Sequence, residues 1–458
     1  MTEIEKKLAQ TVAKQFDETL SDLEDLIRIP SVSWPAFEQK HVFESATAVA
    51  KLLEQTGIFD EVDVRQSLEG DTDKLGHPAV VARKSPKNGK PTVLLYAHHD
   101  VQPPGDPEDW ESPPFVPTRK GDRLYGRGAS DDKAGIISHL AAIRALSEVI
   151  GDLDVGIAVF IEGEEEWASK SFGNFLRDNK ELLTADAIIV ADSDNWDEET
   201  PGLTVALRGA VAVNVTVETL DRASHSGMFG GAVPDAMMAT IRLLDTLWDE
   251  NGSVAIAGYK SADLDVPEYD EQQLRQESGL LNGVTPIGTG EILSRLWAKP
   301  AITITGIDAP DIANASNTIT PKVTVRISSR VAPGQDADEA AQALKTHLLE
   351  NVPFGAKITF GEFDNGQPVL IDTAGWAAKK MREAMKLAWQ KDPIDIGIGG
   401  SIPFIAELVS EFPDAQILVT GVEDPDSRAH SPNESQHLGV LQKAILTEAL
   451  FLADLNES

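Results

Sequence analysis

The stretch TVLLYAHHD, residues 92–100, decides both the fold and the place of its functional site. Its first six residues form a short apolar run, which is typical of a strand buried in a sheet. Two histidines and an aspartate follow at once, where the chain must leave that strand. In an open α/β sheet, ligands bind beyond the carboxyl ends of the strands. The stretch therefore predicts a buried strand that ends at a functional site.

The alternation of strands and helices continues on both sides of this stretch. We expect, in chain order, a helix at 41–57, strands near 61–66, 78–83 and 92–97, a helix at 132–150, a strand at 154–161, a helix near 171–180 and a strand at 187–191. After residue 373 the pattern returns with a helix, a Gly-rich turn, a helix, a strand and a final helix. Buried strands separated by helices of this length predict an α/β sheet covered on both faces.

Between residues 208 and 372 the pattern changes. AVAVNVTVE, residues 210–218, alternates at period two, and the elements that follow complete the order β-α-β-β-α-β of the ferredoxin-like split motif. We therefore expect a discontinuous α/β domain at 1–207 and 373–458 with a mixed, largely parallel sheet. The inserted ferredoxin-like domain is expected at 208–372.

The composition excludes some classes of binding partner and indicates a cellular compartment. A net charge of -34, from 40 basic and 74 acidic residues, argues against nucleic acid or an anionic membrane as partner. The chain has no cysteine, which excludes disulfides and thiolate metal sites and fits a reducing compartment. No apolar run approaches the roughly 20 residues of a membrane span, and the charged amphipathic start is unlike a signal peptide. A cytoplasmic protein is expected.

Residues able to bind metal follow five predicted strands, which we assign to one sheet. They are His98, His99, Asp100, Asp131, Asp132, Glu162, Glu164, Glu165, Glu166, Asp192, Asp194 and His430. Each has an ordinary explanation alone, such as a helix N-cap at Asp131 or Asp132. Together they would fill one crevice with carboxylates and no comparable run of Lys or Arg. Such carboxylates repel one another unless protonated or neutralised by cations, so the pattern predicts divalent metal.

The donor types indicate which metal, and how many ions, would bind. Imidazole and carboxylate without sulfur suit zinc, manganese or cobalt better than calcium. Two histidines and three carboxylates are too many ligands for one tetrahedral zinc. Two ions roughly 3.5–4 Å apart, sharing one carboxylate, would use them all. Such a pair clamps a hydroxide and polarises a carbonyl, which is hydrolytic chemistry.

These residues carry a resemblance to a known family. The motifs are, in order, LIRIPSVS, HHDVQP, LYGRGASDDKAG, EGEEE, LRG, HSGMFGG, RVAPGQD and GGSIP. This series resembles the carnosinase-like dipeptidases of the co-catalytic metallopeptidase family, which also contains aminoacylase, acetylornithine deacetylase and succinyl-diaminopimelate desuccinylase. The resemblance covers the chain from about residue 20 to its end. It implies a metal-binding catalytic domain and an inserted domain that acts as a lid and dimer contact.

The resemblance also assigns metal ligands. It implies two ions per subunit, held by His98, Asp131, Glu166, Asp192 and His430. Asp131 is the expected bridging carboxylate, and Asp132 follows it across a cis peptide. Asp100 is expected to orient His98, whereas His99 points the other way. Asp194 stays open as an alternative to Asp192.

The remaining roles concern catalysis and substrate. The resemblance implies that Glu165 is the general base. It also implies that His225 stabilises the oxyanion from the other subunit of a homodimer, although a histidine in a Ser/Gly-rich turn is otherwise an ordinary loop residue. Arg330 resembles the group that binds the free carboxylate of the substrate, and a guanidinium fork suits that role. Gly400, Ser401 and Asn317 are further candidates for substrate contacts.

The expected activity is hydrolysis of the amide bond of small peptides with a free C-terminal carboxylate, by a metal-bound hydroxide with Glu165 as base. A deacylase or desuccinylase acting on N-acyl amino acids would use the same site. A non-catalytic metal-binding relative is a third reading, against which an intact Glu165 counts.

Overall fold

The computed structural model describes residues 2–400 and 403–457. The chain divides into two compact units. The first unit comprises Met1–Val205, Ile371–Ile396 and Glu407–Ser458, and the second comprises Ala206–Leu370 and Gly397–Ala406. Each unit has a hydrophobic core of its own, as expected of separate domains.

The large sheet has the strand order β1-β2-β6-β3-β7-β17-β8-β15, and β16 also pairs with β8. Its strands are β1 Glu61–Arg65, β2 Ala79–Lys84, β3 Thr92–His98, β6 Gly156–Glu162, β7 Ala187–Val190, β8 Gly202–Leu207, β15 Val369–Leu370, β16 Ile394–Ile398 and β17 Gln416–Val419. Pairing is parallel among β6, β3, β7 and β17, and antiparallel from β1 to β6 and from β17 to β15. The expected mixed sheet is confirmed, with parallel pairing among its central strands.

Helices cover both faces of this sheet because its central strands are apolar on both sides. β3 and β6 are buried along their whole length. Val159 of β6 belongs to the core that α3 and α12 cover, whereas the next residue, Phe160, stacks on Phe175 of α4 with ring centroids 4.7 Å apart. Successive side chains of a strand point to opposite faces, so these neighbours lie on opposite sides of the sheet.

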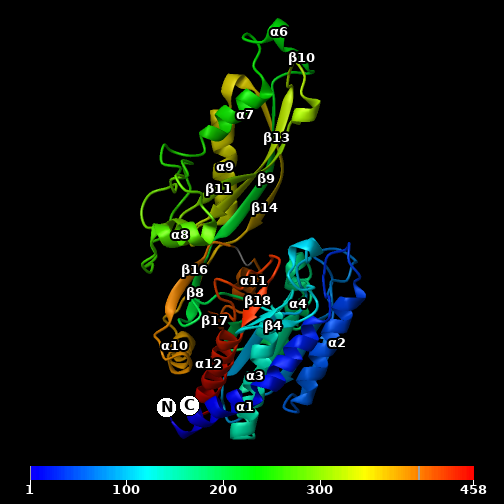
Figure 1. Ribbon diagram of the computed structural model, residues 1–458, viewed down its shortest axis with the longest axis vertical. Helices are drawn as coiled ribbons and strands as arrows, with labels where there is room; N and C mark the ends of the chain where they lie inside the picture. The colour runs from blue at the N-terminus through cyan, green and yellow to red at the C-terminus, as the bar shows by residue number, and fades with distance from the viewer. Residues whose placement is uncertain (1, 401–402, 458) are drawn as a thin grey trace. The chain divides into compact units, whose positions relative to one another are not determined.

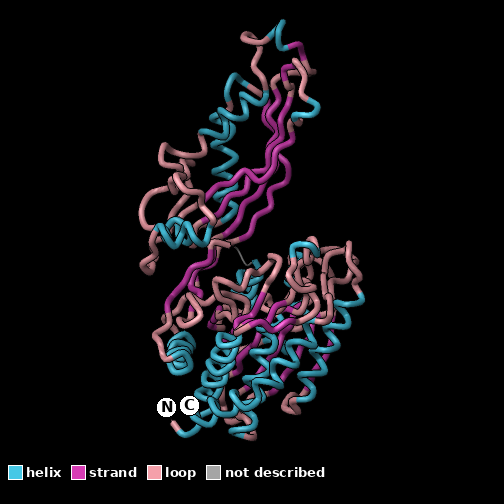
Figure 2. Tube along the Cα trace, viewed as in Figure 1, coloured by secondary structure: helices cyan, strands magenta, loops and turns pink. Residues whose placement is uncertain are grey.

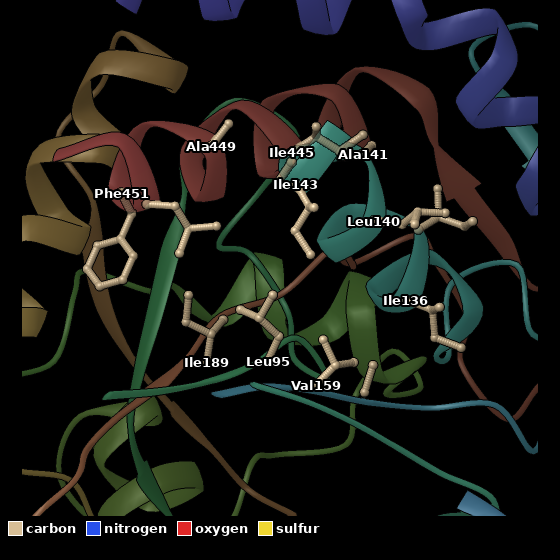
Figure 3. Packing of buried hydrophobic residues seen from close by; sticks show 14 of the residues in the cluster. Leu95, Ile136, Leu140, Ala141, Ile143, Val159, Ile189, Ile445, Ala449 and Phe451 are labelled. Carbon is tan, nitrogen blue, oxygen red and sulfur yellow. The ribbon is translucent and has the colours of Figure 1, made fainter. Parts of the chain in front are cut away.

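The first core lies between the sheet and two long helices. Figure 3 shows Leu140 and Ile143 of α3 and Ile445 of α12 near Leu95 and Ile189 of the strands. In Figure 1, α1 and α12 lie beside α3. The helices with residues in the first unit are α1 Glu3–Ile27, α2 Lys40–Gln55, α3 Lys133–Ile150, α4 Phe172–Asp178, α5 Lys180–Leu183, α10 Trp376–Trp389, α11 Pro403–Glu411 and α12 Leu438–Glu457. Every helix among the described residues is too short or too polar to span a lipid bilayer.

The second unit contains a four-stranded antiparallel sheet in the order β11-β13-β9-β14. Its elements follow the chain as β9 Gly209–Glu218, α7 Ala236–Asp245, β11 Ala301–Asp308, β13 Lys322–Val331, α9 Ala337–Asn351 and β14 Lys357–Gly366. This is the expected β-α-β-β-α-β order. Alternate residues of β9 and β13 are buried against α7 and α9, which run along the strands in Figure 2. Outside this motif lie the paired strands β10 Ser224–His225 and β12 Thr318–Ile319, with α6 Ser226–Phe229 and α8 Glu271–Ser278.

The sequence patterns missed several short elements. A separate three-stranded sheet contains β4 Thr118–Lys120, β5 Arg123–Tyr125 and β18 Ser435–His437. Strands of three residues are too short to show a period. Asp131 lies beyond β5 of this small sheet, and His430 lies between β17 and β18. The prediction that one sheet supplies all five strand ends is therefore wrong.

Candidate metal centre

Two groups of possible metal ligands lie in the first unit. One contains His98, Asp132 and Asp192, and the other contains Asp131, Glu166 and His430. Within each group, ligand atoms lie within 4.8 Å of one another. Three segments that leave the carboxyl ends of β3, β6 and β7 supply His98, Glu166 and Asp192. Parallel strands end at the same edge of a sheet, which brings these residues together.

Asp131 links the two groups. Its Oδ1 lies 3.0 Å from Nε2 of His98, and its Oδ2 lies 2.9 Å from Nε2 of His430. His430 Nε2 is also 3.3 Å from Glu166 Oε2, and His98 Nε2 is 3.9 Å from Asp192 Oδ1. One carboxylate thus presents an oxygen to each histidine. The peptide bond between Asp131 and Asp132 is cis.

Asp100 connects His98 to the segment that follows β6. The Nδ1 of His98 lies 3.4 Å from Oδ1 of Asp100 and 3.1 Å from its backbone oxygen. The Asp100 carboxylate also accepts hydrogen bonds from the backbone N–H groups of Glu165, at 3.2 Å, and Glu166, at 3.1 Å. Ser33 Oγ donates a third, at 2.7 Å. A single buried carboxylate therefore orients His98 and both glutamates.

The four glutamates of EGEEE divide into two pairs. Glu162 accepts a hydrogen bond of 2.6 Å from the Tyr96 hydroxyl, and Glu164 accepts backbone N–H groups of His77 and Ser171. Both are held by groups outside the metal-ligand groups. Glu165 and Glu166 begin the short 3₁₀ turn η2 Glu165–Trp167.

Negative charge is crowded in this site. Burial raises the pKa of Glu166 to about 7, aided by the nearby charge of Asp131. Burial likewise raises the pKa of Asp192 to about 6 and that of Glu165 well above its usual range. Hydrogen bonds to Asp131 and Glu166 raise the pKa of His430 to about 11. Each shift favours a proton on a group in the cluster, which is expected where buried carboxylates lie close together.

Two buried carboxylate oxygens also indicate a site for cations. Oε1 of Glu166 and Oδ1 of Asp132 have no hydrogen-bond partner among the described residues. Buried carboxylate oxygens almost always have a partner. Imidazole nitrogens and carboxylate oxygens are also the donors that zinc, manganese and cobalt accept. The residues present therefore fit divalent cations.

Sequence reasoning missed one buried carboxylate beside the site. Glu434 accepts hydrogen bonds from the side chain of Arg127, at 2.6 Å, and from the backbone N–H groups of Gly128, Ser130 and Asp131, at 3.0–3.1 Å. It thereby holds the segment that leads into Asp131. In the sequence, Glu434 could have been recognised by its position in HSPNE, four residues after the candidate ligand His430.

Two other candidates near the site lie outside both groups. His99 Nε2 donates a hydrogen bond of 2.8 Å to the backbone oxygen of Pro78. Burial lowers its pKa to about 4, so the ring is neutral. Asp194 belongs to neither ligand group among the described residues. It pairs by backbone with Glu423, and burial raises its pKa to about 7.

The candidate substrate residues belong to the second unit. His225 and Asn317 are neighbours, because His225 pairs with Thr318 across β10 and β12. Both are exposed. Arg330 lies near the end of β13, eight residues after its start at Lys322. Gly400 is partly buried, and Ser401 lies outside the described residues.

Comparisons with known proteins extend over nearly the whole chain. The model of Peptidase family M20/M25/M40 matches residues 94–454. A cysteinylglycine-S-conjugate dipeptidase of Corynebacterium striatum is 34% identical over 415 residues, which is 89% of either protein. The Cys-Gly metallodipeptidase dug1 of Schizosaccharomyces pombe is 27% identical and covers 98% of both chains. The crystal structure of human carnosine dipeptidase 1 shares the fold, with a TM-score of 0.80, 24% identity and 100% of both chains covered.

Proposed function

Because this chain belongs to Peptidase family M20/M25/M40, we propose that its substrates are dipeptides with a free C-terminal carboxylate. Membership and the dipeptidases among the relatives confirm two expectations from the motifs, namely an enzyme and a metallopeptidase that hydrolyses small peptides. Two of these relatives are named for Cys-Gly substrates, which makes Cys-Gly and its conjugates the first dipeptides to test.

The proposed metal centre holds two ions per subunit. His98 and Asp192 would hold one, Glu166 and His430 would hold the other, and Asp131 would be shared between them. The observation that carries this proposal is the position of Asp131, whose two oxygens lie 3.0 Å and 2.9 Å from the two histidines. Asp192 is preferred to Asp194 because it lies 3.9 Å from His98. We propose zinc, with manganese or cobalt as alternatives.

The side chains of this centre have different roles in hydrolysis. When bound, a pair of divalent ions polarises the scissile carbonyl and lowers the pKa of water. Glu165 takes a proton from the attacking water and passes it to the leaving nitrogen. Its raised pKa suits a group that must hold that proton between the two transfers. Asp100 holds the backbone of Glu165, so the base keeps its place during the transfers.

We propose that residues of two subunits complete the substrate site. Asn317 precedes β12 beside His225, whereas Arg330 lies eight residues along β13 from Lys322. At about 3.3 Å per residue, that part of β13 spans roughly 26 Å, far more than a dipeptide. Arg330 and Gly400, with Ser401, would bind the substrate carboxylate within one subunit. His225 and Asn317 would reach the site of a partner in a homodimer, where His225 stabilises the oxyanion.

We assign a separate role to each domain. The segments 1–207 and 373–458 form the catalytic domain, and 208–372 forms the lid and dimer contact. A cytoplasmic enzyme fits a chain without cysteine.

The test is to load the full-length protein with zinc or manganese and measure both bound metal and turnover. We expect close to two ions per chain and hydrolysis of Cys-Gly and β-Ala-His in preference to N-acetyl and N-succinyl amino acids. Activity should disappear on chelation and return with metal. One ion per chain in a fully active sample contradicts the bridged pair, and preference for the N-acyl amino acids contradicts the dipeptidase.

A further inference from the structure

A pocket of about 640 Å³ lies within the second unit, beside the edge strand β11. The turn 284–289, the helix α8 and the residues Ala301–Thr303 of β11 contribute to its wall. Ligand pockets commonly enclose about 300–1,000 Å³ and are lined by apolar groups with a few polar ones. The volume and this composition are therefore those of a site for a small molecule.

The lining is apolar except for its cations and hydroxyls. Trp248, Leu274, Ile287, Ile292 and Leu296 form much of the apolar surface. Two of these large apolar side chains remain accessible, since Ile287 is 69% exposed and Leu296 is 36% exposed. Large apolar side chains gathered around a pocket favour the apolar body of a ligand.

The pocket lining is positively charged, whereas the whole chain is negatively charged. Arg208, Arg295 and Lys299 line the pocket, and no lining residue is Asp or Glu. The chain as a whole carries 74 acidic residues against 40 basic ones. Three cations without carboxylates repel one another and attract an anion.

Backbone carbonyls, rather than carboxylates, hold these cations in place. Arg295 donates to the backbone oxygens of Gly290, at 2.9 Å and 2.5 Å, and Ile287, at 3.1 Å. Lys299 Nζ donates to Thr289 O at 2.6 Å. Gly290 has φ +87°, a backbone conformation that favours glycine, and it lies beside Lys299 Nζ.

Arg208 ties the three cations into one group. Its guanidinium donates to the backbone oxygens of Arg295, at 3.4 Å, and Lys299, at 3.3 Å. The side-chain hydrogen bonds of all three go to backbone oxygens, and no residue that lines the pocket carries a carboxylate. Full charges therefore remain for a ligand, because hydrogen bonds to carbonyls leave a cation charged.

We propose that this pocket is a second ligand site, which binds a small amphipathic anion with an apolar or aromatic body and one carboxylate or sulfonate group. The apolar side chains bind the body of the ligand, and Arg295 and Lys299 bind its anionic group. Charge complementarity selects this occupant over a neutral molecule or a cation.

Two fluorescent probes that differ by one charged group test the proposal. 8-Anilinonaphthalene-1-sulfonate and the neutral N-phenyl-1-naphthylamine share their rings, and only the first carries a sulfonate. Titration of the full-length, metal-loaded protein should show at least tenfold tighter binding of the sulfonate. Lys299→Gln, which keeps a donor for Thr289, should weaken sulfonate binding about tenfold and leave the neutral probe unchanged.

Two tryptophan variants then locate the site. Thr303→Trp on β11 fills the pocket and should remove the tight sulfonate binding. Thr359→Trp on β14 alters an exposed threonine on the opposite edge of the same sheet and should have no effect. Equal affinity for the two probes overturns the proposal, as does tight binding that survives both Lys299→Gln and Thr303→Trp. The glutamine variant keeps the test decisive if Thr303→Trp fails to fold.

Discussion

The two units hold their candidate active-site side chains in opposite ways. In the first unit, His98 and Asp100 are buried and contact each other, and Asp100 accepts three further hydrogen bonds. In the second, His225 is exposed, and its ring accepts one hydrogen bond from the backbone of Gly227 at 3.1 Å. A buried cluster is oriented by its own unit. An exposed histidine with one local contact gains a catalytic environment only when another surface covers it.

The two sheets explain this difference. β3 and β6 are buried on both faces, so the polar residues of the large sheet gather beyond the strand ends. β9 and β13 alternate between buried and less buried residues, so the second sheet has one covered face and one that accepts polar side chains such as Arg330. If this difference holds, the first unit is sufficient for the metal centre, and the second is needed only to complete the active site.

The largest effect is expected at Glu165. Glu165→Gln removes the proton acceptor while its backbone remains bonded to Asp100, so kcat should fall about 10²–10⁴-fold with bound metal unchanged. Glu166→Gln is the matched change next to it. Because Glu166 belongs to a ligand group, this variant should lose metal as well as activity. Elemental analysis measures the metal content of each variant, and steady-state kinetics measures its kcat. Metal loss in Glu165→Gln but not in Glu166→Gln would show that Glu165 is the ligand and Glu166 the base.

The second-largest effect on activity is expected at His225. Loss of an oxyanion donor typically lowers kcat about 10²–10³-fold, and His225→Ala should do so without changing metal content. Refolding His225→Ala together with Glu165→Ala should restore a clear fraction of activity, because a mixed dimer regains one complete site. The controls are the two variants, each refolded alone, which should stay inactive. If subunits demonstrably exchange and the mixture stays inactive, His225 does not act across a dimer.

Glu434 should affect metal binding without touching a metal. Glu434→Gln leaves Arg127 without its buried carboxylate and weakens the hold on the backbone of Asp131, so metal affinity should fall about 10–100-fold. Glu448→Gln is a matched control, since Glu448 is also buried and paired, with His139 at 2.7 Å on α3. Both variants should lower the melting temperature, but only Glu434→Gln should weaken metal binding in a calorimetric titration. Equal metal affinity in the two variants would limit Glu434 to a structural role.

The smallest effect concerns pH and stability at His139. Burial alone would lower its pKa, but the charge and hydrogen bond of Glu448 and the backbone oxygen of Tyr96 raise it. A raised folded pKa contributes stability that is complete below the unfolded value of about 6.5 and is lost as pH rises through the folded pKa. The melting temperature of the wild type minus that of His139→Asn should therefore decrease as pH rises from about 6 to 9. A difference that stays constant or increases would contradict the charged pair.

The sequence was most informative where a pattern extends over many residues. The long apolar strands predicted the large sheet, and period-two alternation predicted the split motif of the second unit. The ordered motifs predicted the family, which the comparisons confirm. Prediction failed at β4, β5 and β18, because strands of three residues show no period. The residue types alone did not separate Glu162 and Glu164, which bind Tyr96 and backbone N–H groups, from Glu165 and Glu166; only the family resemblance gave the last two their roles.

Sequence alone determined the types of donor available, since imidazole and carboxylate without cysteine already indicate metals that accept nitrogen and oxygen. It also determined the strand ends that place His98, Glu166 and Asp192 at one sheet edge. Only the tertiary structure decided that Asp131, from a different and smaller sheet, presents one oxygen to His98 and the other to His430. It alone decided that Glu434, some 300 residues further along the chain, holds the backbone of Asp131. Distances between segments so far apart depend on how the chain packs, and no local pattern encodes them.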